Sequence, residues 1–260
     1  MSDVDVIVLD ATGGGDMLRD CLRSIAGARE IVVFDNGSPS PIRIEGARVI
    51  RSETNLGFAA GVNEALRHTR APYVALINND VILDRDWIDV TSRALDSDAK
   101  MAAVQTIIRR DAKTIDGAGI DISDGTYRQI GHGLPIGSAP PPAWGVSATA
   151  TLFRRSALGD RVFDPRFFAY YEDVELSARL HEGAWRTTVL PVDKATHRGS
   201  ASAAVLGTAA RRLRTRNRYF VARMHPGVGR ISALMAEDFK LILKGRTSLR
   251  GVIEGLCSRL

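Results

Sequence analysis

The sequence predicts an α/β fold in which a mostly parallel central sheet carries helices on both faces. Strand-like and helix-like patterns alternate over short loops through the first hundred residues, which is typical of such sheets. With 260 residues, 45% of them hydrophobic and 25% charged, the chain has the size and composition of a globular protein with a full core. Asp10, Asp35 and Asp80 stand where predicted strands end. Because open α/β sheets bind ligands beyond the carboxyl ends of their strands, these acids mark the expected site.

The first half of the chain supplies most of the predicted sheet. Runs of β-branched or apolar residues that end in polar turns predict strands over residues 4–9, 30–34, 48–50, 73–77 and 101–108. Apolar residues three or four positions apart predict helices between them, over residues 16–26, 58–68 and 86–95. We expect these helices to form the layers that cover the sheet.

The second half is less regular. Residues 111–142 are rich in glycine, end in three prolines and predict an irregular loop or hairpin region. Patterned sequence then resumes, with a strand over 146–154, a helix over 172–181 and a strand over 186–190. From Ala203 onward the pattern is helical. We therefore expect a main domain over residues 1–202 and a helical extension over residues 203–260 that packs on it.

The extension is strongly basic, although the net charge of the whole chain is only +5. Residues 198–260 carry 11 Arg and 2 Lys against 3 acids. Such an asymmetry suits a polyanionic partner, whether an anionic lipid, a nucleic acid or a diphosphate. The alternative is a solvated helix surface in a chain that uses arginine throughout, since only five of its 35 basic residues are lysine.

Two amphipathic segments are predicted inside the extension, separated near Gly245. Their apolar residues recur at positions 231, 234/235, 239, 242, 249, 252/253, 256 and 260. These faces either pack on the body of the protein or lie on a membrane surface, with Arg and Lys toward the headgroups. Both uses remain open.

Several absences bear on location. No stretch approaches the roughly 18 apolar residues that span a bilayer, and the N-terminus has no basic secretory segment. The two cysteines, Cys21 and Cys257, belong to no disulfide or zinc pattern. We therefore expect a cytoplasmic protein, with the inner face of the plasma membrane as a candidate surface for peripheral attachment.

Two clusters of polar residues follow predicted strands. Asp35, within 34–38, could accept a hydrogen bond from the N–H of a uracil or thymine base, although Asp-Asn-Gly is also a common turn. Asp80, after the apolar run 73–77, could offer its carboxylate to a hard divalent cation that bridges a substrate diphosphate. In isolation, a turn or a helix cap is the more common reason for either pattern.

A third cluster opens the predicted helix over 172–181. Four aromatic residues within 167–171 precede Glu172 and Asp173. Acids in a first helical turn complement the helix dipole by a few tenths of a kcal/mol to about 1 kcal/mol. Aromatic shielding argues for a further role, because a partly desolvated carboxylate is a better base.

Together, these clusters resemble the family 2 glycosyltransferases of the GT-A fold, especially the rhamnosyltransferase-like members. The resemblance runs through most of the chain and rests on the stretches 30–38, 55–63, 76–81, 163–168, 172–176, 183–185, 197–202 and 216–218. Each stretch is modest by itself, whereas their order and spacing are specific.

The resemblance implies a role for each cluster. Asp173 would be the general base and Glu172 a supporting residue, while Asp80 and His197 would hold Mg²⁺ or Mn²⁺ on the diphosphate. Asp80 is the single charged residue of 78–80, where the family often has two aspartates, and residues 11–13 depart from its usual Thr-Tyr-Asn-like stretch. The implied nucleotide and donor contacts are Ala11, Asp35, Asn36, Asn55, Gly57, Phe58, Asn63, Asn78 and Asn79.

The implied reaction moves a sugar, with inversion at the anomeric carbon, from a dTDP- or UDP-sugar to a hydroxyl of a glycan or lipid-linked acceptor. Rhamnose is one candidate sugar, and bacterial cell-surface polysaccharide synthesis is the implied setting. An anionic membrane surface is a candidate partner.

The residues leave two alternatives open. A sugar-nucleotide nucleotidyltransferase would need a basic residue after the glycines 13–15, and none comes before Arg19. A basic nucleic-acid-binding protein would need aromatic residues interleaved with its arginines, and the extension offers Tyr219 and Phe220. We therefore expect a nucleotide-sugar enzyme without a nucleic-acid partner.

Overall fold

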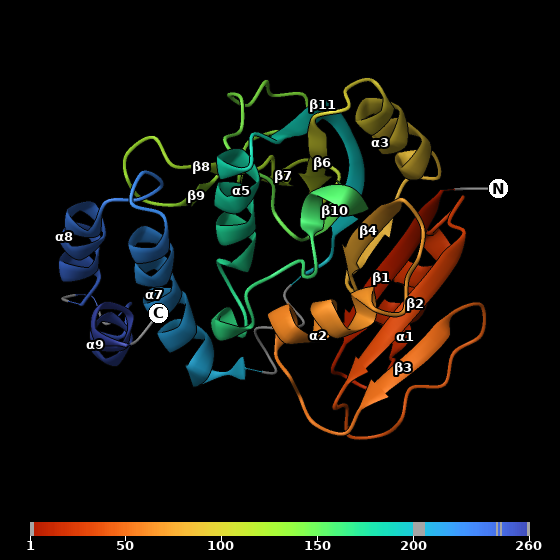
Figure 1. Ribbon diagram of the computed structural model, residues 1–260, viewed down its shortest axis with the longest axis horizontal. Coiled ribbons are helices and arrows are strands. Elements are labelled where there is room, and N and C mark those ends of the chain that lie inside the picture. The colour runs from red at the N-terminus through yellow and green to blue at the C-terminus, as the bar shows by residue number, and fades with distance from the viewer. Residues whose placement is uncertain (1–2, 200–205, 243, 245, 259–260) are drawn as a thin grey trace.

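The computed structural model shows a mixed α/β protein built on one large sheet (Figure 1). It describes residues 3–199, 206–242, 244 and 246–258. The strands follow the order β3-β2-β1-β4-β10-β6-β11-β5, and β7 pairs with β6 outside this order. Their bounds are β1 (Val4–Asp10), β2 (Glu30–Asn36), β3 (Arg48–Ser52), β4 (Tyr73–Asn78), β5 (Val81–Leu83), β6 (Met101–Arg109), β7 (Ile115–Gly117), β10 (Ala150–Arg154) and β11 (Arg186–His197).

The two halves of this sheet differ in direction. Strands β3, β2, β1 and β4 all run parallel, as the alternation of strands and helices predicts. Strand β10 is antiparallel to both of its neighbours, β4 and β6. It enters the sheet after the irregular middle region, and an antiparallel neighbour needs no covering crossover helix. The sheet is therefore mixed, with its parallel part formed by the first half of the chain.

Helices cover both faces of the sheet, as predicted. On one face, α1 (Asp16–Ser24) and α3 (Trp87–Asp96) bury Leu18 and Trp87 against the strands. On the other face, α2 (Phe58–Leu66) and α5 (Glu172–Glu182) bury Val62 and Leu176. The short helices α4 (Arg155–Leu158) and η1 (Pro165–Phe167) connect β10 to α5.

The middle region forms the predicted loops and hairpin. Strands β8 (Ile120–Asp121) and β9 (Arg128–Gln129) make a small separate sheet. Strand β11 is longer than the predicted strand over 186–190, because it continues through irregular register past Pro191. This continuation pairs His197 with Val81 of β5 and so brings it beside Asp80.

In the described part of the chain, the helices that follow the sheet are α7 (Thr208–Met224), α8 (Ile231–Ile242) and α9 (Leu249–Cys257). Helix α7 packs on the body through Phe220, which meets Phe167 edge-on with ring centroids 6.1 Å apart. Helix α9 lies close to α7 at Gly251 and Gly255, since a Cβ on either would come within 2.7 Å of an α7 carbonyl oxygen. The predicted domain boundary at 202/203 lies outside the described residues.

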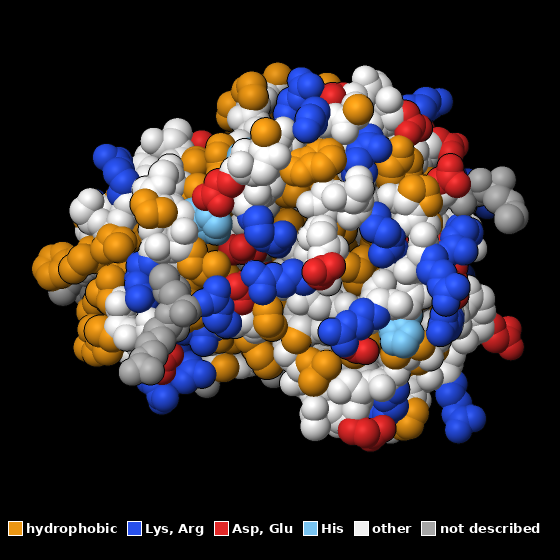
Figure 2. Space-filling model, viewed as in Figure 1, with side chains coloured by type: hydrophobic (Ala, Val, Ile, Leu, Met, Phe, Trp, Pro, Cys, Tyr) orange, Lys and Arg blue, Asp and Glu red, His pale blue; other side chains and the backbone are white. Residues whose placement is uncertain are grey.

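The two outer helices carry apolar residues on two faces. Leu234 of α8 is buried, and Val252 and Leu256 of α9 pack beside it against α7. A second set is exposed, and Figure 2 shows hydrophobic side chains gathered over α8 and α9 at that edge of the molecule. We call this exposed set the apolar ridge: Met235, Phe239, Ile242, Leu249 and Ile253. Within the described part of the chain, no helix is long and apolar enough to cross a membrane.

Candidate active site

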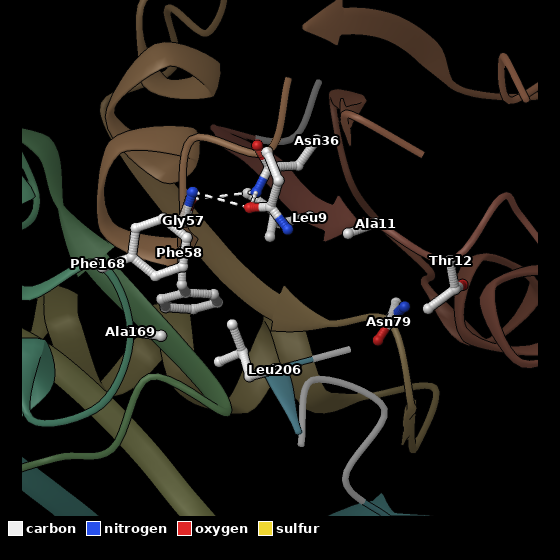
Figure 3. A pocket seen from close by; sticks show the side chains of 11 residues that line it. Leu9, Ala11, Thr12, Asn36, Gly57, Phe58, Asn79, Phe168, Ala169 and Leu206 are labelled. Atoms are coloured by element: carbon white, nitrogen blue, oxygen red, sulfur yellow. Dashed lines mark hydrogen bonds between the residues drawn. The ribbon is translucent and has the colours of Figure 1, made fainter. Parts of the chain in front are cut away.

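A small pocket, of about 50 Å³, opens beyond the carboxyl ends of β1 and β2, where the site was expected. The rings of Phe58 and Phe168 lie on one side of it, and Thr12 and Asn79 lie on the other (Figure 3). Apolar walls with a few convergent polar groups are typical of small-molecule sites. We call it the strand-end pocket, lined by Leu9, Ala11, Thr12, Asn36, Asn55, Gly57, Phe58, Asn79, Phe168, Ala169 and Leu206.

One wall of this pocket is held by two asparagine side chains. The Asn36 amide N–H donates to Asn55 Oδ1 and to the Gly57 carbonyl, both at 3.1 Å. Asn55 Oδ1 also accepts from the Gly57 N–H at 2.9 Å. Gly57 adopts φ +83°, and a Cβ there would lie 2.6 Å from the Phe168 ring. Glycine is therefore required where the loop that enters α2 meets Phe168.

The opposite wall depends on Asp10, which is fully buried at the end of β1. Its carboxylate accepts from the N–H groups of Thr12, Gly13 and Gly14 at 2.9 to 3.1 Å. The Asn79 side-chain amide also donates to it. Asp10 thus sets the loop after β1 and ties it to the end of β4, which positions Thr12 and Asn79 in the pocket wall.

Asp35, the predicted base-contacting acid, does not line the pocket. Its buried carboxylate accepts from Ser38 Oγ at 2.5 Å, from the Ile42 N–H at 3.1 Å and from Arg51 Nη1 at 2.6 Å. Burial works to raise the pKa of Asp35, but the hydrogen bonds from Ser38 and Arg51 outweigh it and hold the pKa below its usual value. The structure thus uses this carboxylate to fix the turn after β2.

Two other predicted donor contacts also lie away from the pocket lining. The Asn63 side chain donates to the Phe163 carbonyl at 2.7 Å and accepts from the Val162 and Phe163 N–H groups. It joins α2 to a segment one hundred residues later. Asn78 ends β4, and its buried Oδ1 has no hydrogen-bond partner among the described residues. Asn63 therefore has a structural use that its spacing did not reveal.

The two predicted metal ligands lie side by side. His197 Nε2 is 3.2 Å from Asp80 Oδ2, and His197 Nδ1 is 2.7 Å from Asp116 Oδ2. Burial disfavours the charged ring, but the Asp116 and Asp80 carboxylates outweigh burial and raise the pKa of His197 to about 10. The structure thus holds His197 as an imidazolium between two carboxylates, in a cluster that includes the unpredicted Asp116.

Glu172 and Asp173 open α5, as predicted. Glu172 is 6% exposed, and burial together with the adjacent Asp173 charge raises the pKa of Glu172 to about 8. Asp173 is half-buried and accepts from the N–H groups of Val174 at 2.9 Å and Ala148 at 3.3 Å. Burial nevertheless raises the pKa of Asp173. The pKa values of both acids are therefore raised, and the cause they share is burial.

The backbone just before these acids is strained. Phe168, Tyr170 and Tyr171 all have positive φ, between 63° and 73°. Non-glycine residues in this region each cost about 1 to 3 kcal/mol, and such costs cluster at functional sites. Asn217 of α7 offsets the strain, because its amide donates to the carbonyls of Phe167, Ala169 and Tyr170 at 2.7 to 2.9 Å. The extension therefore supports the segment that presents Asp173.

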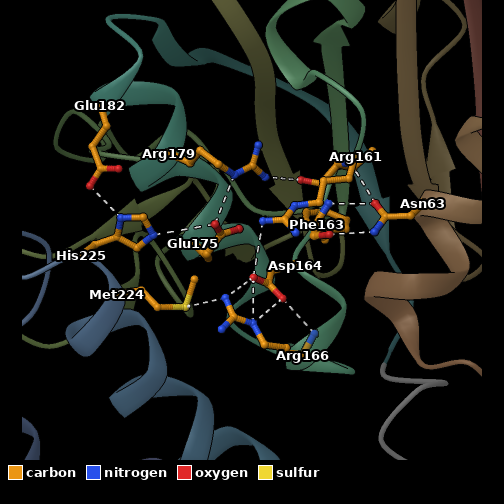
Figure 4. Close-up of polar contacts among 11 residues, drawn as sticks. Asn63, Arg161, Phe163, Asp164, Arg166, Glu175, Arg179, Glu182, Met224 and His225 are labelled. Atoms are coloured by element: carbon orange, nitrogen blue, oxygen red, sulfur yellow. Dashed lines mark hydrogen bonds and ion pairs between the residues drawn. The ribbon is translucent and has the colours of Figure 1, made fainter. Parts of the chain in front are cut away.

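Ion pairs anchor both ends of this segment (Figure 4). Arg166 makes a two-pronged contact with buried Asp164, with N–O distances of 2.6 to 3.1 Å. On α5, buried Glu175 pairs with Arg179 at 3.2 Å and lies 3.8 Å from His225, which follows α7. The carboxylates of Glu175 and Glu182 raise the pKa of His225 despite its partial burial. These contacts join α5 to the extension.

Comparison with known proteins identifies this architecture. Residues 6–161 match the family described as Glycosyl transferase family 2. The chain belongs to the family 2 glycosyltransferases. The matched region contains the lining residues of the strand-end pocket from Leu9 to Asn79, together with Asp80 and Asp116.

Known relatives agree with the family and the fold. This glycosyltransferase is 25% identical, over 236 aligned residues that cover 76% of each chain, to the N-acetylglucosaminyl-diphospho-decaprenol L-rhamnosyltransferase of Mycobacterium tuberculosis. Its fold matches the mannosyltransferase PcManGT of Pyrobaculum calidifontis, solved with GDP-Man and Mn²⁺, with a TM-score of 0.61 at 17% identity. That match covers 91% of this chain and 69% of the other. The expected GT-A fold is confirmed.

A second solved structure, TarS of S. aureus with UDP-GlcNAc, matches with a TM-score of 0.60 at 17% identity, over 86% of this chain and 65% of the other.

Several residues of the candidate site were not predicted. Asp116 lies in the irregular middle region, where no pattern marks it. Asn217 belongs to a stretch that carries the resemblance, but its backbone contacts depend on a segment fifty residues earlier. Phe168 and Ala169 lie just before Glu172, and no local pattern indicates that they line the same pocket as Asn36.

Proposed function

We propose that this glycosyltransferase moves a sugar from a nucleoside-diphosphate sugar to a hydroxyl of a lipid-linked or glycan acceptor, with inversion at the anomeric carbon. Asp173 takes the proton of the acceptor hydroxyl. At the same time, the acceptor oxygen bonds to the anomeric carbon, and the bond between that carbon and the donor diphosphate breaks. The observation that carries the proposal is the half-buried Asp173 carboxylate at the end of a strained segment whose residues Phe168 and Ala169 line the strand-end pocket.

We assign the donor to the strand-end pocket. Among its lining residues, Phe58 or Phe168 is available to pack against the base of a nucleoside, and Asn79 is available to the polar groups of the base. A dTDP- or UDP-sugar remains the expected donor, and rhamnose is supported as a candidate sugar by the name of the mycobacterial relative.

Among the described residues, no group of three or more His, Cys, Asp or Glu side chains could hold a metal ion by itself, so a divalent cation here would depend on the donor diphosphate for further ligands. Mg²⁺ in such enzymes needs only one or two protein carboxylates, because substrate phosphates and waters fill the other positions. Asp80 and Asp116 supply carboxylate oxygens, and His197 supplies a nitrogen that Mn²⁺ also accepts. Bound there, Mg²⁺ or Mn²⁺ would offset charge on the leaving diphosphate. Ligation by His197 would require the imidazolium to lose a proton and the ring to give up one of its two carboxylate partners.

Thermal-shift measurements with dTDP-, UDP- and GDP-sugars, with and without Mn²⁺, test the donor assignment. A donor at one hundred times its Kd stabilises a protein by about 2.7 kcal/mol, which is a readily measured shift. Any donor that shifts the protein is then supplied with a lipid-linked acceptor, and the anomeric configuration of the product is determined. A retained configuration, or no shift with any nucleotide sugar, contradicts the proposal.

Peripheral attachment to an anionic membrane is the second part of the proposal. The apolar ridge exposes Phe239 by 66% and Leu249 by 60%, and the exposed cations Lys240, Lys244 and Arg250 lie on the same two helices and their connection. This combination suits the interface between headgroups and acyl chains. A lipid-linked acceptor, like the one named for the mycobacterial relative, would be reached at such a surface.

Co-sedimentation with vesicles of phosphatidylglycerol and phosphatidylcholine tests this attachment. Phe239→Asp with Leu249→Asp should release the protein from the vesicles. Leu134→Asp is the matched control, because Leu134 is 42% exposed but lies on the body of the protein. Equal binding by the ridge variant and the control argues against membrane attachment through α8 and α9.

A further inference from the structure

A second pocket, of about 390 Å³, lies between α7 and the connection from α8 to α9. Four arginines line it, and no acidic residue does. We call it the arginine pocket: Arg211, Arg214, Arg218 and Arg246, with Tyr171, Gly207 and Leu241 at its edges. None of its lining residues belongs to the strand-end pocket, so the two are separate sites on the described chain.

The arginines of this pocket differ in their partners. Arg218 is buried and pairs with Glu237 at 2.5 Å and with Asp238, which balance its charge. Arg214 is exposed, and its guanidinium stacks over the Tyr170 ring at 4.3 Å. Among the described residues, neither Arg214 nor Arg246 forms an ion pair with a carboxylate. The pocket therefore presents positive charge that the protein does not neutralise.

The two pockets share their boundaries. Leu206 lines the strand-end pocket, and the next residue, Gly207, lines the arginine pocket. In the same way, Ala169 lines the first pocket and Tyr171 lines the second. The strained segment before α5 thus separates the pockets, and Asp173 follows it directly.

The far side of the arginine pocket meets the apolar ridge. Leu241 of α8 lines the pocket, and the adjacent Ile242 belongs to the ridge. A long apolar group on the ridge could therefore continue into the pocket, and from there a polar head would face the start of α5.

We propose that the arginine pocket binds the diphosphate of a lipid-linked acceptor. The apolar chain would lie along the ridge, and the acceptor sugar would point toward Asp173. Guanidinium groups suit this ligand because their fork of N–H donors matches phosphate oxygens and remains charged at any physiological pH. The inference rests on the proposed function, and it names the part of the acceptor that the enzyme recognises.

Farnesyl diphosphate is the probe for this site, with farnesol and inorganic pyrophosphate as comparisons. Calorimetry should show that Arg214→Gln with Arg246→Gln weakens farnesyl diphosphate binding at least about tenfold, as expected for lost charged hydrogen bonds. Binding of the nucleotide-sugar donor should be unchanged. Lys100→Gln with Lys113→Gln is the charge-matched control, because both lysines are exposed, lie on the body of the protein and are outside the pocket lining. Arg246→Gln alone tests the site without disturbing the stack on Tyr170.

The readouts separate this inference from the proposed function. In transfer assays, the arginine variant should raise the KM for a diphosphate-linked acceptor at least about tenfold and leave the KM for the donor unchanged. Unchanged binding of farnesyl diphosphate by the arginine variant, or equally weakened binding by the lysine control, overturns the inference. Neither result contradicts the proposed function, which is tested separately by replacing Asp173 with asparagine. If the variant loses binding to phosphatidylglycerol vesicles but not to farnesyl diphosphate, the pocket recognises a headgroup and the inference is also overturned.

Discussion

Asp35 and the Glu172-Asp173 pair are both buried acidic sites, yet the structure treats them in opposite ways. Asp35 receives hydrogen bonds from a hydroxyl, from backbone N–H groups and from a guanidinium, and its pKa is lowered. Asp173 receives two backbone hydrogen bonds, and its pKa is raised together with that of Glu172. Burial alone therefore does not distinguish a catalytic acid from a structural one. The distinguishing property is whether the surrounding protein already supplies the carboxylate with hydrogen-bond donors.

Replacement of the base candidate should give the largest effect. Asp173→Asn cannot accept a proton from the acceptor, so transfer should fall at least about 100-fold, with donor binding and thermal stability close to wild type. Initial rates and donor Kd values measure this. Asp89→Asn is the control, because Asp89 is an exposed acid in the first turn of α3. A similar loss of transfer rate in both variants would indicate that Asp173 acts only by complementing the helix dipole.

Replacement of the structural acid should instead lower stability. Asp35→Asn leaves Arg51 without its carboxylate, and we expect a loss of about 2 to 3 kcal/mol in the free energy of unfolding. Since the folded pKa of Asp35 is lowered, its stabilisation is present above the unfolded value, near 3.8, and is lost as pH falls through the folded value. Urea denaturation at pH 7 and below pH 4 checks both statements. If the Asp35→Asn variant instead keeps full stability and loses donor binding, Asp35 contacts the donor, as the resemblance implies.

The support given by α7 to the strained segment should show in both stability and rate. Asn217→Ala removes the donor to three carbonyls, and we expect a loss of about 1 to 3 kcal/mol together with a lower kcat. Asn63→Ala provides the comparison, since it also removes backbone contacts but at a segment away from Asp173. If both variants lose stability and keep the same kcat, Asn217 does not position the base.

The smallest effect at neutral pH should come from Glu172→Gln. Glutamine resembles the protonated carboxyl, and because the pKa of Glu172 is raised to about 8, the wild type is mostly in that form at pH 7. Since the folded pKa exceeds the unfolded value of 4.5, wild-type stability should decline from about pH 4.5 to pH 8 relative to the variant. Melting temperatures at pH 5, 7 and 8.5 test this. Parallel curves for the two proteins would show that Glu172 ionises normally.

Local sequence predicted the first half of the fold well. Apart from the short strand β5, which was not predicted, the strands and helices through residue 109 lie where their patterns placed them. The reason is that a two-residue or 3.6-residue pattern records which face of an element is buried. Strand β11 was predicted too short, since Pro191 and the polar residues 193–194 hide its continuation. The antiparallel entry of β10 was also not predicted, because strand direction depends on the connection rather than on the strand itself.

The sequence by itself determined the family, the alternation of strands and helices, and the candidate carboxylates at strand and helix ends. These are local features, and a pattern of a few residues is enough to express them. Which of those side chains already have hydrogen-bond partners within the protein became clear only from the tertiary structure. Asp35 and Asn63 became structural through Arg51 and Phe163, whereas the surroundings of Asp173 left it few donors. The physical reason is that hydrogen-bond satisfaction and desolvation depend on partners far away along the chain, and only folding brings them together.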